Sequence, residues 1–177
     1  MKSLYDRIYN KRYEKYYDKL VMFLNDLKTS NRMPTDKEFK EALIHKPLYS
    51  KPICKYVLSA IENSTKEHID VTNLTIEHIL PQKLNAVVWK KEIGEDYDRV
   101  YELYLHTLGN LTITGNNSEL GTKPFYEKKK IIQDNSKANI LNKDVLSATV
   151  WNEKSILNRA ESLSEILIDL FDYVKVH

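Results

Sequence analysis

Two short segments that favour β-strand stand in a sequence whose remaining pattern is that of helices. Residues 74–80 and 111–114 are rich in β-branched and apolar side chains, and they end at Pro81 and Gly115. The 177 residues include only 4 glycines and 5 prolines, which argues for helices joined by few loops. We therefore expect an α+β fold that is mostly helical, with very little sheet.

The first part of the chain has apolar residues at helical spacing. Residues 3–29 predict one long helix that contains five tyrosines. These rings form either a surface that stacks on bases or meets a partner, or ordinary core packing, and packing is the commoner role. Thr35 and Glu38 form a capping box at the start of a second helix, and Pro52 marks the start of a third.

Helical patterns continue on both sides of the second strand-like segment. They are predicted over residues 86–93, 95–106, 124–133 and, after a cap at Asn152, over most of the remaining sequence. Arg159 lies near the apolar stripe of this last helix. A buried structural arginine explains that position better than a ligand-binding role does.

Length and composition limit the organisation of the chain. Its size suits one domain, or one domain with a helical subdomain, and we expect a helical lead-in over residues 1–70 and the main domain over residues 71–177. The net charge of +2 gives no general sign of a nucleic-acid partner.

Cysteine content and hydropathy limit the cellular location that we expect for the chain. One cysteine excludes an internal disulfide framework and a cysteine-rich zinc site, and it favours a reducing, cytoplasmic location. No apolar run approaches the roughly 20 residues that a membrane span needs, and the N-terminus becomes charged too early for a signal peptide. We therefore expect no membrane partner.

The stretch 75–130 concentrates the side chains that phosphodiester cleavage requires. An attacking water must lose a proton, and a neutral histidine with an ordinary pKa of about 6.5, here His78, is a natural base. The leaving oxygen gains charge that a divalent cation on hard oxygen ligands can stabilise. Glu77 offers a carboxylate, Asn110 and Asn117 offer amide oxygens, and the lysines that follow can hold phosphates.

Each of these residues also has an ordinary structural explanation. Glu77 can be a solvent-facing strand residue, and His78 can be a core histidine with its hydrogen bonds satisfied. Asn110 suits a turn beside Gly109, and Asn117 suits a helix cap. A run of lysines is usually a solvated helix face. Spacing alone leaves both interpretations open.

The order of the motifs resembles a known nuclease family. The matching strings are Ile76-Glu77-His78-Ile79-Leu80-Pro81-Gln82, Leu108-Gly109-Asn110-Leu111-Thr112-Ile113-Thr114-Gly115, Asn117-Ser118-Glu119-Leu120, Lys123-Pro124-Phe125 and Glu127-Lys128, with Trp151, Ile156 and Arg159 further on. Over residues 73–170 the chain resembles the C-terminal domain of GmrSD-type modification-dependent (type IV) restriction endonucleases, an HNH nuclease domain of the ββα-metal class.

This resemblance implies roles for individual residues. Glu77 and Asn117 would hold one divalent metal ion, Mg²⁺ or Mn²⁺, His78 would be the general base, and Asn110 would tie the loop that orients it. Lysines that would contact nucleic acid are Lys123, Lys128 and Lys129. Alternation along a regular strand puts Glu77 and His78 on opposite faces. The implied HNH-like core, embedded in a helical domain, would bring both to one site by bending the strand end.

The resemblance also implies partners and a biological setting. The substrate would be DNA, with modified phage DNA as one candidate, in a restriction system for anti-phage defence. An N-terminal nucleotide-hydrolysing domain, absent from this sequence, would be a further partner. The alternatives are a non-catalytic module that binds nucleic acid or a partner, and a purely structural helical adaptor.

Overall fold

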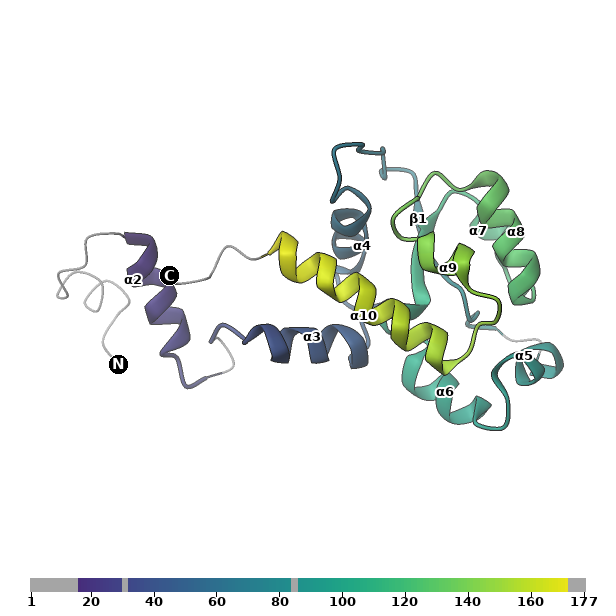
Figure 1. Ribbon diagram of the computed structural model, residues 1–177, viewed down its shortest axis with the longest axis horizontal. Helices are drawn as coiled ribbons and strands as arrows, with labels where there is room; N and C mark the ends of the chain where they lie inside the picture. The colour runs from purple at the N-terminus through teal and green to yellow at the C-terminus, as the bar shows by residue number, and fades with distance from the viewer. Residues whose placement is uncertain (1–15, 30–31, 84–85, 172–177) are drawn as a thin grey trace.

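The computed structural model describes residues 16–29, 32–83 and 86–171, and over these the chain is mostly helical with one two-stranded sheet (Figure 1). The elements in order are α2 (Tyr16–Asn25), α3 (Asp36–His45), α4 (Cys54–Glu62), β1 (Thr75–His78), α5 (Ala86–Ile93), α6 (Tyr97–Tyr104), the 3₁₀ turn η1 (Leu108–Asn110), β2 (Leu111–Thr114), α7 (Asn117–Leu120), α8 (Phe125–Asn135), α9 (Lys143–Ser147) and α10 (Glu153–Leu170). The expected α+β class is confirmed. No helix in the described ranges is long and apolar enough to cross a membrane.

The sheet is a single antiparallel pair whose register runs from Thr75 opposite Thr114 to His78 opposite Leu111. Every residue of β2 is buried, while β1 is exposed at its start and buried at its end. In Figure 1 the sheet lies between α4 on one side and α7 and α8 on the other. Helices therefore cover a two-stranded sheet that could not be stable alone.

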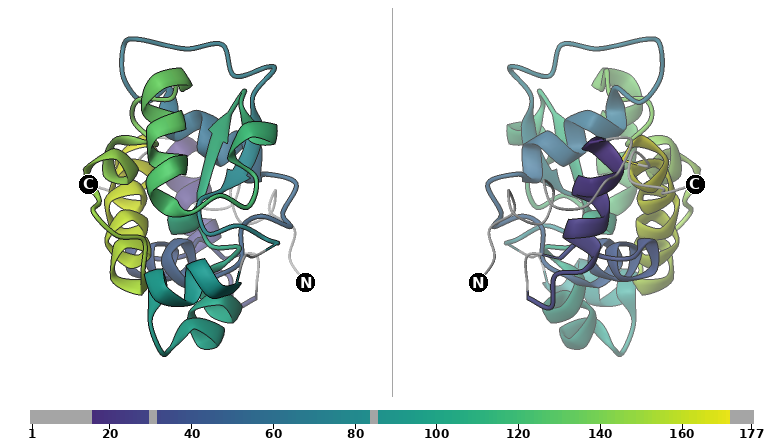
Figure 2. Two further views of the ribbon diagram at one scale, coloured as in Figure 1. Left: turned by 90° about the vertical axis from the view of Figure 1, so that its right-hand side faces the viewer. Right: turned by 90° about the vertical axis from the view of Figure 1, so that its left-hand side faces the viewer.

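Two apolar clusters form the core. One gathers around Trp151, which stacks on Phe125 with ring centroids 5.2 Å apart, and it includes residues of α5 and α6. The other joins α4 to β2 and α10. Figure 2 shows α5 and α6 at the opposite end of the body from the loop that joins α4 to β1.

The described part of the lead-in shares this second cluster. Leu58 and Ile61 of α4 are fully buried together with Leu111 and Ile113 of β2. Helix α3 packs along α10. From α3 onward, the lead-in therefore packs into the same apolar core as the strands. The domain division at residue 70 stays a prediction.

Local signals at the helix ends match the structure. Thr35 accepts a hydrogen bond from Glu38 N and the Glu38 side chain accepts one from Thr35 N, so the capping box is present. Asn152 caps α10 by accepting from Ser155 N at 3.2 Å. Of the long helix expected over 3–29, the structure describes Tyr16–Asn25 as helix, and three of its five tyrosines lie outside the described residues.

Helix α10 crosses η1 at very short range. An added Cβ at Gly109 would overlap the Ile156 carbonyl oxygen and would lie 3.0 Å from the Ala160 Cβ. One turn further along α10, the Arg159 guanidinium donates hydrogen bonds to the carbonyls of Leu108, Gly109, Leu111 and Leu141 at 2.7–3.3 Å. The arginine is 1% exposed, so its expected structural role is confirmed, with carbonyls as its partners.

Gly109→Ala is therefore expected to destabilise the protein by about 1–3 kcal/mol or more, since the obstructing atom is backbone and cannot rotate away. Urea unfolding followed by circular dichroism measures the effect. Gly115→Ala is the matched control, because the nearest atom there is Leu74 Cδ2 at 3.8 Å, and it should change stability by less than about 0.5 kcal/mol. Equal stabilities of the two variants would contradict the close approach.

Candidate active site

The outer edge of β1 is covered by side chains from the helices that follow β2. Asn117, at the start of α7, donates from Nδ2 to the Ile76 carbonyl at 3.2 Å and to Thr75 Oγ1 at 3.3 Å. Lys128 in α8 donates to the His78 carbonyl at 2.7 Å. These carbonyls of an edge strand would otherwise need water or another chain, so both side chains complete the strand's hydrogen bonding.

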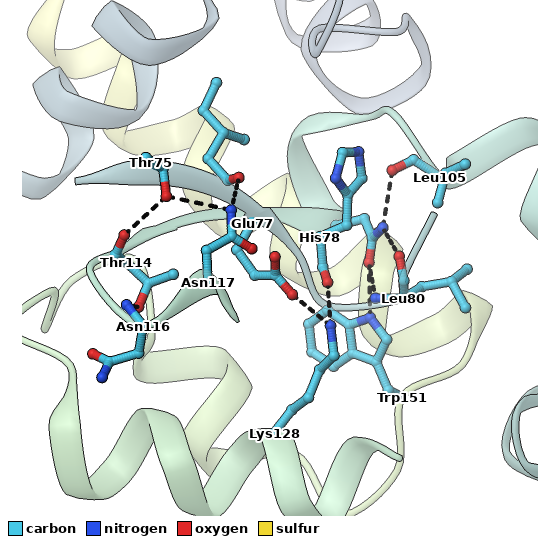
Figure 3. A network of polar contacts seen from close by, with 12 residues as sticks. Thr75, Glu77, His78, Leu80, Leu105, Thr114, Asn116, Asn117, Lys128 and Trp151 are labelled. Carbon is cyan, nitrogen blue, oxygen red and sulfur yellow. Dashed lines mark hydrogen bonds and ion pairs between the residues drawn. The ribbon is translucent and has the colours of Figure 1, made fainter. Parts of the chain in front are cut away.

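Lys128 also forms a buried ion pair with Glu77. Its Nζ lies 2.6 Å from Glu77 Oε1, and the two side chains are 0% and 9% exposed (Figure 3). Burial raises the pKa of Glu77 and lowers the pKa of Lys128, and their mutual attraction opposes both shifts. The carboxylate that the sequence suggested as a metal ligand thus already carries one cationic partner.

His78 lies on the opposite face of β1. Figure 3 shows its ring directed away from the Glu77 carboxylate and Lys128. Its Nε2 is 3.1 Å from Nδ1 of His106, and the Tyr49 ring meets it edge-on with centroids 4.5 Å apart. The residue is 4% exposed, and burial, followed by electrostatic repulsion from His106 and Lys128, lowers the His78 pKa to about 3. The His78 imidazole is therefore neutral at neutral pH.

The strand does not bend as the resemblance implied. His78 stays opposite Leu111 in a regular ladder, and Ile79 N still donates to the Asn110 carbonyl at 3.0 Å. Because side chains alternate along such a ladder, Glu77 and His78 point to different sides. Glu77 lies with Lys128 (Figure 3), while His78 lies with His106 and Tyr49.

Asn110 is fully buried and uses its whole amide. Its Oδ1 accepts from Leu80 N at 2.7 Å and from Trp151 Nε1 at 3.1 Å, while Nδ2 donates to the carbonyls of Leu80 and Leu105 at 3.0 and 2.9 Å. No atom remains for a metal or a substrate. The residue fixes the segment directly after His78, and a contribution to orienting that ring stays a prediction.

The three candidate phosphate-binding lysines have different environments. Lys123 is exposed and pairs with Glu127 at 3.0 Å. Lys129 is half-buried and donates to the Ala148 carbonyl at 2.8 Å. Lys128 is buried against Glu77, so it would have to leave that pair to touch a phosphate. Their roles toward nucleic acid stay predictions.

A cation could use two oxygens on the α8 side of β1. Among the described residues no group of three or more histidine, cysteine, aspartate or glutamate side chains is arranged to hold a metal. In the part of the chain that the structure describes, the buried side-chain nitrogen or oxygen atom without a hydrogen bond is the Trp89 indole nitrogen. Glu77 Oε2 and Asn117 Oδ1 are therefore not buried polar atoms that lack a partner. A carboxylate and an amide oxygen suit a hard divalent cation, and the Lys128 charge beside them weakens the fit.

Sequence reasoning missed His106 and Tyr49. His106 is the last residue of a helix predicted over residues 95–106, and no pattern in the sequence assigns a role to Tyr49. Their backbone is joined: the His106 carbonyl accepts from the N–H groups of Leu48 and Tyr49 at 2.8 and 3.1 Å. No spacing rule links residues 57 positions apart, so only the fold could reveal this contact.

Lys128→Met should destabilise the protein by about 3–5 kcal/mol, because it leaves the Glu77 carboxylate buried without its partner. The double variant Glu77→Gln/Lys128→Met should recover part of that loss, as measured by urea unfolding. Lys123→Met breaks an exposed lysine–glutamate pair and should cost less than about 1 kcal/mol. Equal losses for the two single variants would show that the Glu77–Lys128 pair is not buried as described.

Comparison with known proteins gives one family. The family model described as GmrSD restriction endonucleases, C-terminal domain, matches residues 33–166. This range begins shortly before α3 and includes most of α10. No curated protein and no solved structure gives a significant match. The family implies a nuclease role of the restriction type with DNA as substrate, and nucleases of this kind generally use a divalent metal. Since the match spans well over half of the sequence, the chain belongs to the GmrSD restriction endonuclease family, as its C-terminal domain.

Proposed function

We propose that this domain is a metal-dependent DNA endonuclease that hydrolyses phosphodiester bonds with His78 as general base. The observation that carries the proposal is the family match over residues 33–166, which includes both strands and the helices that cover them. An HNH-type division of labour, with one base and one divalent cation, would use His78 and Glu77 of β1 together with Asn117.

Glu77 and Asn117 would hold the cation, Mg²⁺ or Mn²⁺, through Oε2 and Oδ1. When bound, the cation would stabilise the negative charge that develops on the leaving 3′ oxygen. The Asn117 amide nitrogen would stay on the Ile76 carbonyl at 3.2 Å, so the same contact that covers the strand edge would aim the amide oxygen. Asn110 would serve only by fixing the segment beyond His78.

His78 would take the proton of the attacking water on Nδ1. Its Nε2 is occupied by His106, whereas Nδ1 has no hydrogen-bond partner in the described chain and is not among the sealed, unpartnered atoms. As the water oxygen bonds to phosphorus, its proton would pass to Nδ1 and the bond to the 3′ oxygen would break. Lys123, Lys128 and Lys129 would hold flanking phosphates, with Lys128 released from Glu77.

Two rearrangements are needed for one phosphate to meet both groups. Glu77 and His78 lie on opposite faces of β1, so the phosphate would lie across the strand end or the strand would twist on binding. The Tyr49 ring, 37% exposed, covers the His78–His106 pair and would move to admit the substrate. We include three further points in the proposal. The substrate would be modified phage DNA, a nucleotide-hydrolysing domain would be a partner, and the domain would act in cytoplasmic defence against phage.

His78→Ala is expected to lower metal-dependent nicking of supercoiled DNA by about 10²- to 10⁴-fold, the usual contribution of a general base. Circular dichroism should be unchanged. His68→Ala, at an exposed loop histidine, is the matched control and should cleave at the wild-type rate. A folded His78→Ala variant with the wild-type rate would remove His78 from the mechanism.

Metal binding tests the other half of the site. Mn²⁺ titration followed by water proton relaxation should show binding that EDTA reverses and that Asn117→Ala weakens by about 10-fold or more. Asn117→Asp keeps an oxygen ligand and adds charge, so it should bind Mn²⁺ at least as well as wild type. Asn116→Ala changes the neighbouring asparagine, whose amide contacts Glu119, and should leave affinity unchanged.

A non-catalytic binding module is the second candidate, and the buried Glu77–Lys128 pair favours it, because a neutralised carboxylate attracts a cation weakly. DNA binding that ignores EDTA, with no nicking under Mg²⁺ or Mn²⁺, would support this alternative. Salt dependence of binding would separate both candidates from a structural adaptor, which binds no DNA.

A further inference from the structure

The contact between two histidine side chains on the face of β1 opposite Glu77 has a definite chemical consequence. His78 and His106 face each other through Nε2 and Nδ1 at 3.1 Å, with ring planes at 78°. Two ring nitrogens at this distance share one hydrogen, so one nitrogen donates and the other accepts. The identity of the donor decides whether Nδ1 of His78 has a free lone pair.

We infer that His106 is a positioning residue that accepts the Nε2–H of His78 and so holds the lone pair of His78 on Nδ1, where a base needs it. This rests on the proposed function of His78. The hydrogen bond that one ring nitrogen makes sets the tautomer and the orientation of the whole imidazole. His106 itself would touch neither substrate nor metal.

Two arrangements of the shared hydrogen are possible. If His78 donates, each ring carries its hydrogen on Nε2, the tautomer that free neutral histidine prefers. If His106 donates, each ring carries it on Nδ1, and both rings adopt the less stable form. In the second arrangement His78 has no lone pair left for water. The favoured arrangement is thus the one that leaves a base.

The position of His106 is itself fixed from the lead-in. Its carbonyl accepts from Leu48 N and Tyr49 N, at 2.8 and 3.1 Å. The Tyr49 ring stacks on the His106 ring at 5.4 Å with planes 12° apart, and it touches His78 edge-on. The two hydrogen bonds fix the His106 backbone and the Tyr49 ring packs on its imidazole, so the His106 ring is held facing His78.

Two substitutions separate acceptor chemistry from packing. His106→Asn places an amide oxygen near the position of Nδ1 and keeps the acceptor, while His106→Leu keeps comparable volume without it. His45→Leu makes the same change at an exposed histidine on α3 and is the control. Nitrogen-15 NMR of the imidazoles in the metal-free full chain reads the His78 tautomer directly, apart from any cleavage.

Wild type and His106→Asn should show His78 protonated on Nε2 with Nδ1 bare, and His106→Leu should lose the protected Nε2–H signal. In the nicking assay, His106→Leu should lower kcat by about 10²- to 10⁴-fold with little change in KM, and His106→Asn should recover most of the rate. His45→Leu should match wild type in both measurements.

Three outcomes would overturn the inference: His78 protonated on Nδ1 in the wild type, a retained protected Nε2–H signal with an unchanged rate in His106→Leu, or no recovery by His106→Asn when its fold is intact. If circular dichroism shows that His106→Leu does not fold, the inference is tested by the other two measurements. It then requires His78 protonated on Nε2 in the wild type and a near wild-type cleavage rate in His106→Asn. A wild-type chain with the expected tautomer but no cleavage would instead contradict the proposed nuclease function, so the two failures are distinct.

Discussion

The described fold depends on how η1 and the start of β2 are held against the segment that leaves β1. Asn110 makes four side-chain hydrogen bonds there, two of them to the backbone of Leu80, and Arg159 collects the carbonyls on either side of it. A two-stranded sheet has too few ladder bonds to hold itself. These buried amide and guanidinium groups supply the missing constraint, and Gly109 permits α10 to come close enough for Arg159 to reach.

The same arrangement sets what the candidate site can do. A regular ladder through His78 separates the carboxylate from the imidazole, so each has its own surroundings. Glu77 lies in a buried pair with Lys128, and His78 lies in an aromatic cluster with His106 and Tyr49. One face thus offers the Glu77 carboxylate beside the Lys128 ammonium, and the other offers a neutral imidazole. Catalysis would join them at the end of the strand.

Several parts of this picture could be predicted from neighbouring residues. The capping box of Thr35 and Glu38, the cap at Asn152 and the β-branched strand after Asn110 all depend on contacts within a few positions, and all are present. The family was also identifiable, because its motifs follow one another in fixed order. The burial of Lys128 was not predictable, since its run of lysines looks like a solvated face until Glu77 is brought against it from 51 positions away.

The sequence by itself determined the helical character, the two short strands, the family and the residue types that a nuclease site requires, since these rest on local periodicity, capping and motif order. Only the tertiary structure decided which side chains meet. The β1–β2 register placed Glu77 and His78 on opposite faces, α8 brought Lys128 to the carboxylate, and the turn after α6 brought His106 to His78 under Tyr49. These contacts join distant parts of the chain, and their geometry follows from packing around the shared core, which no local pattern encodes.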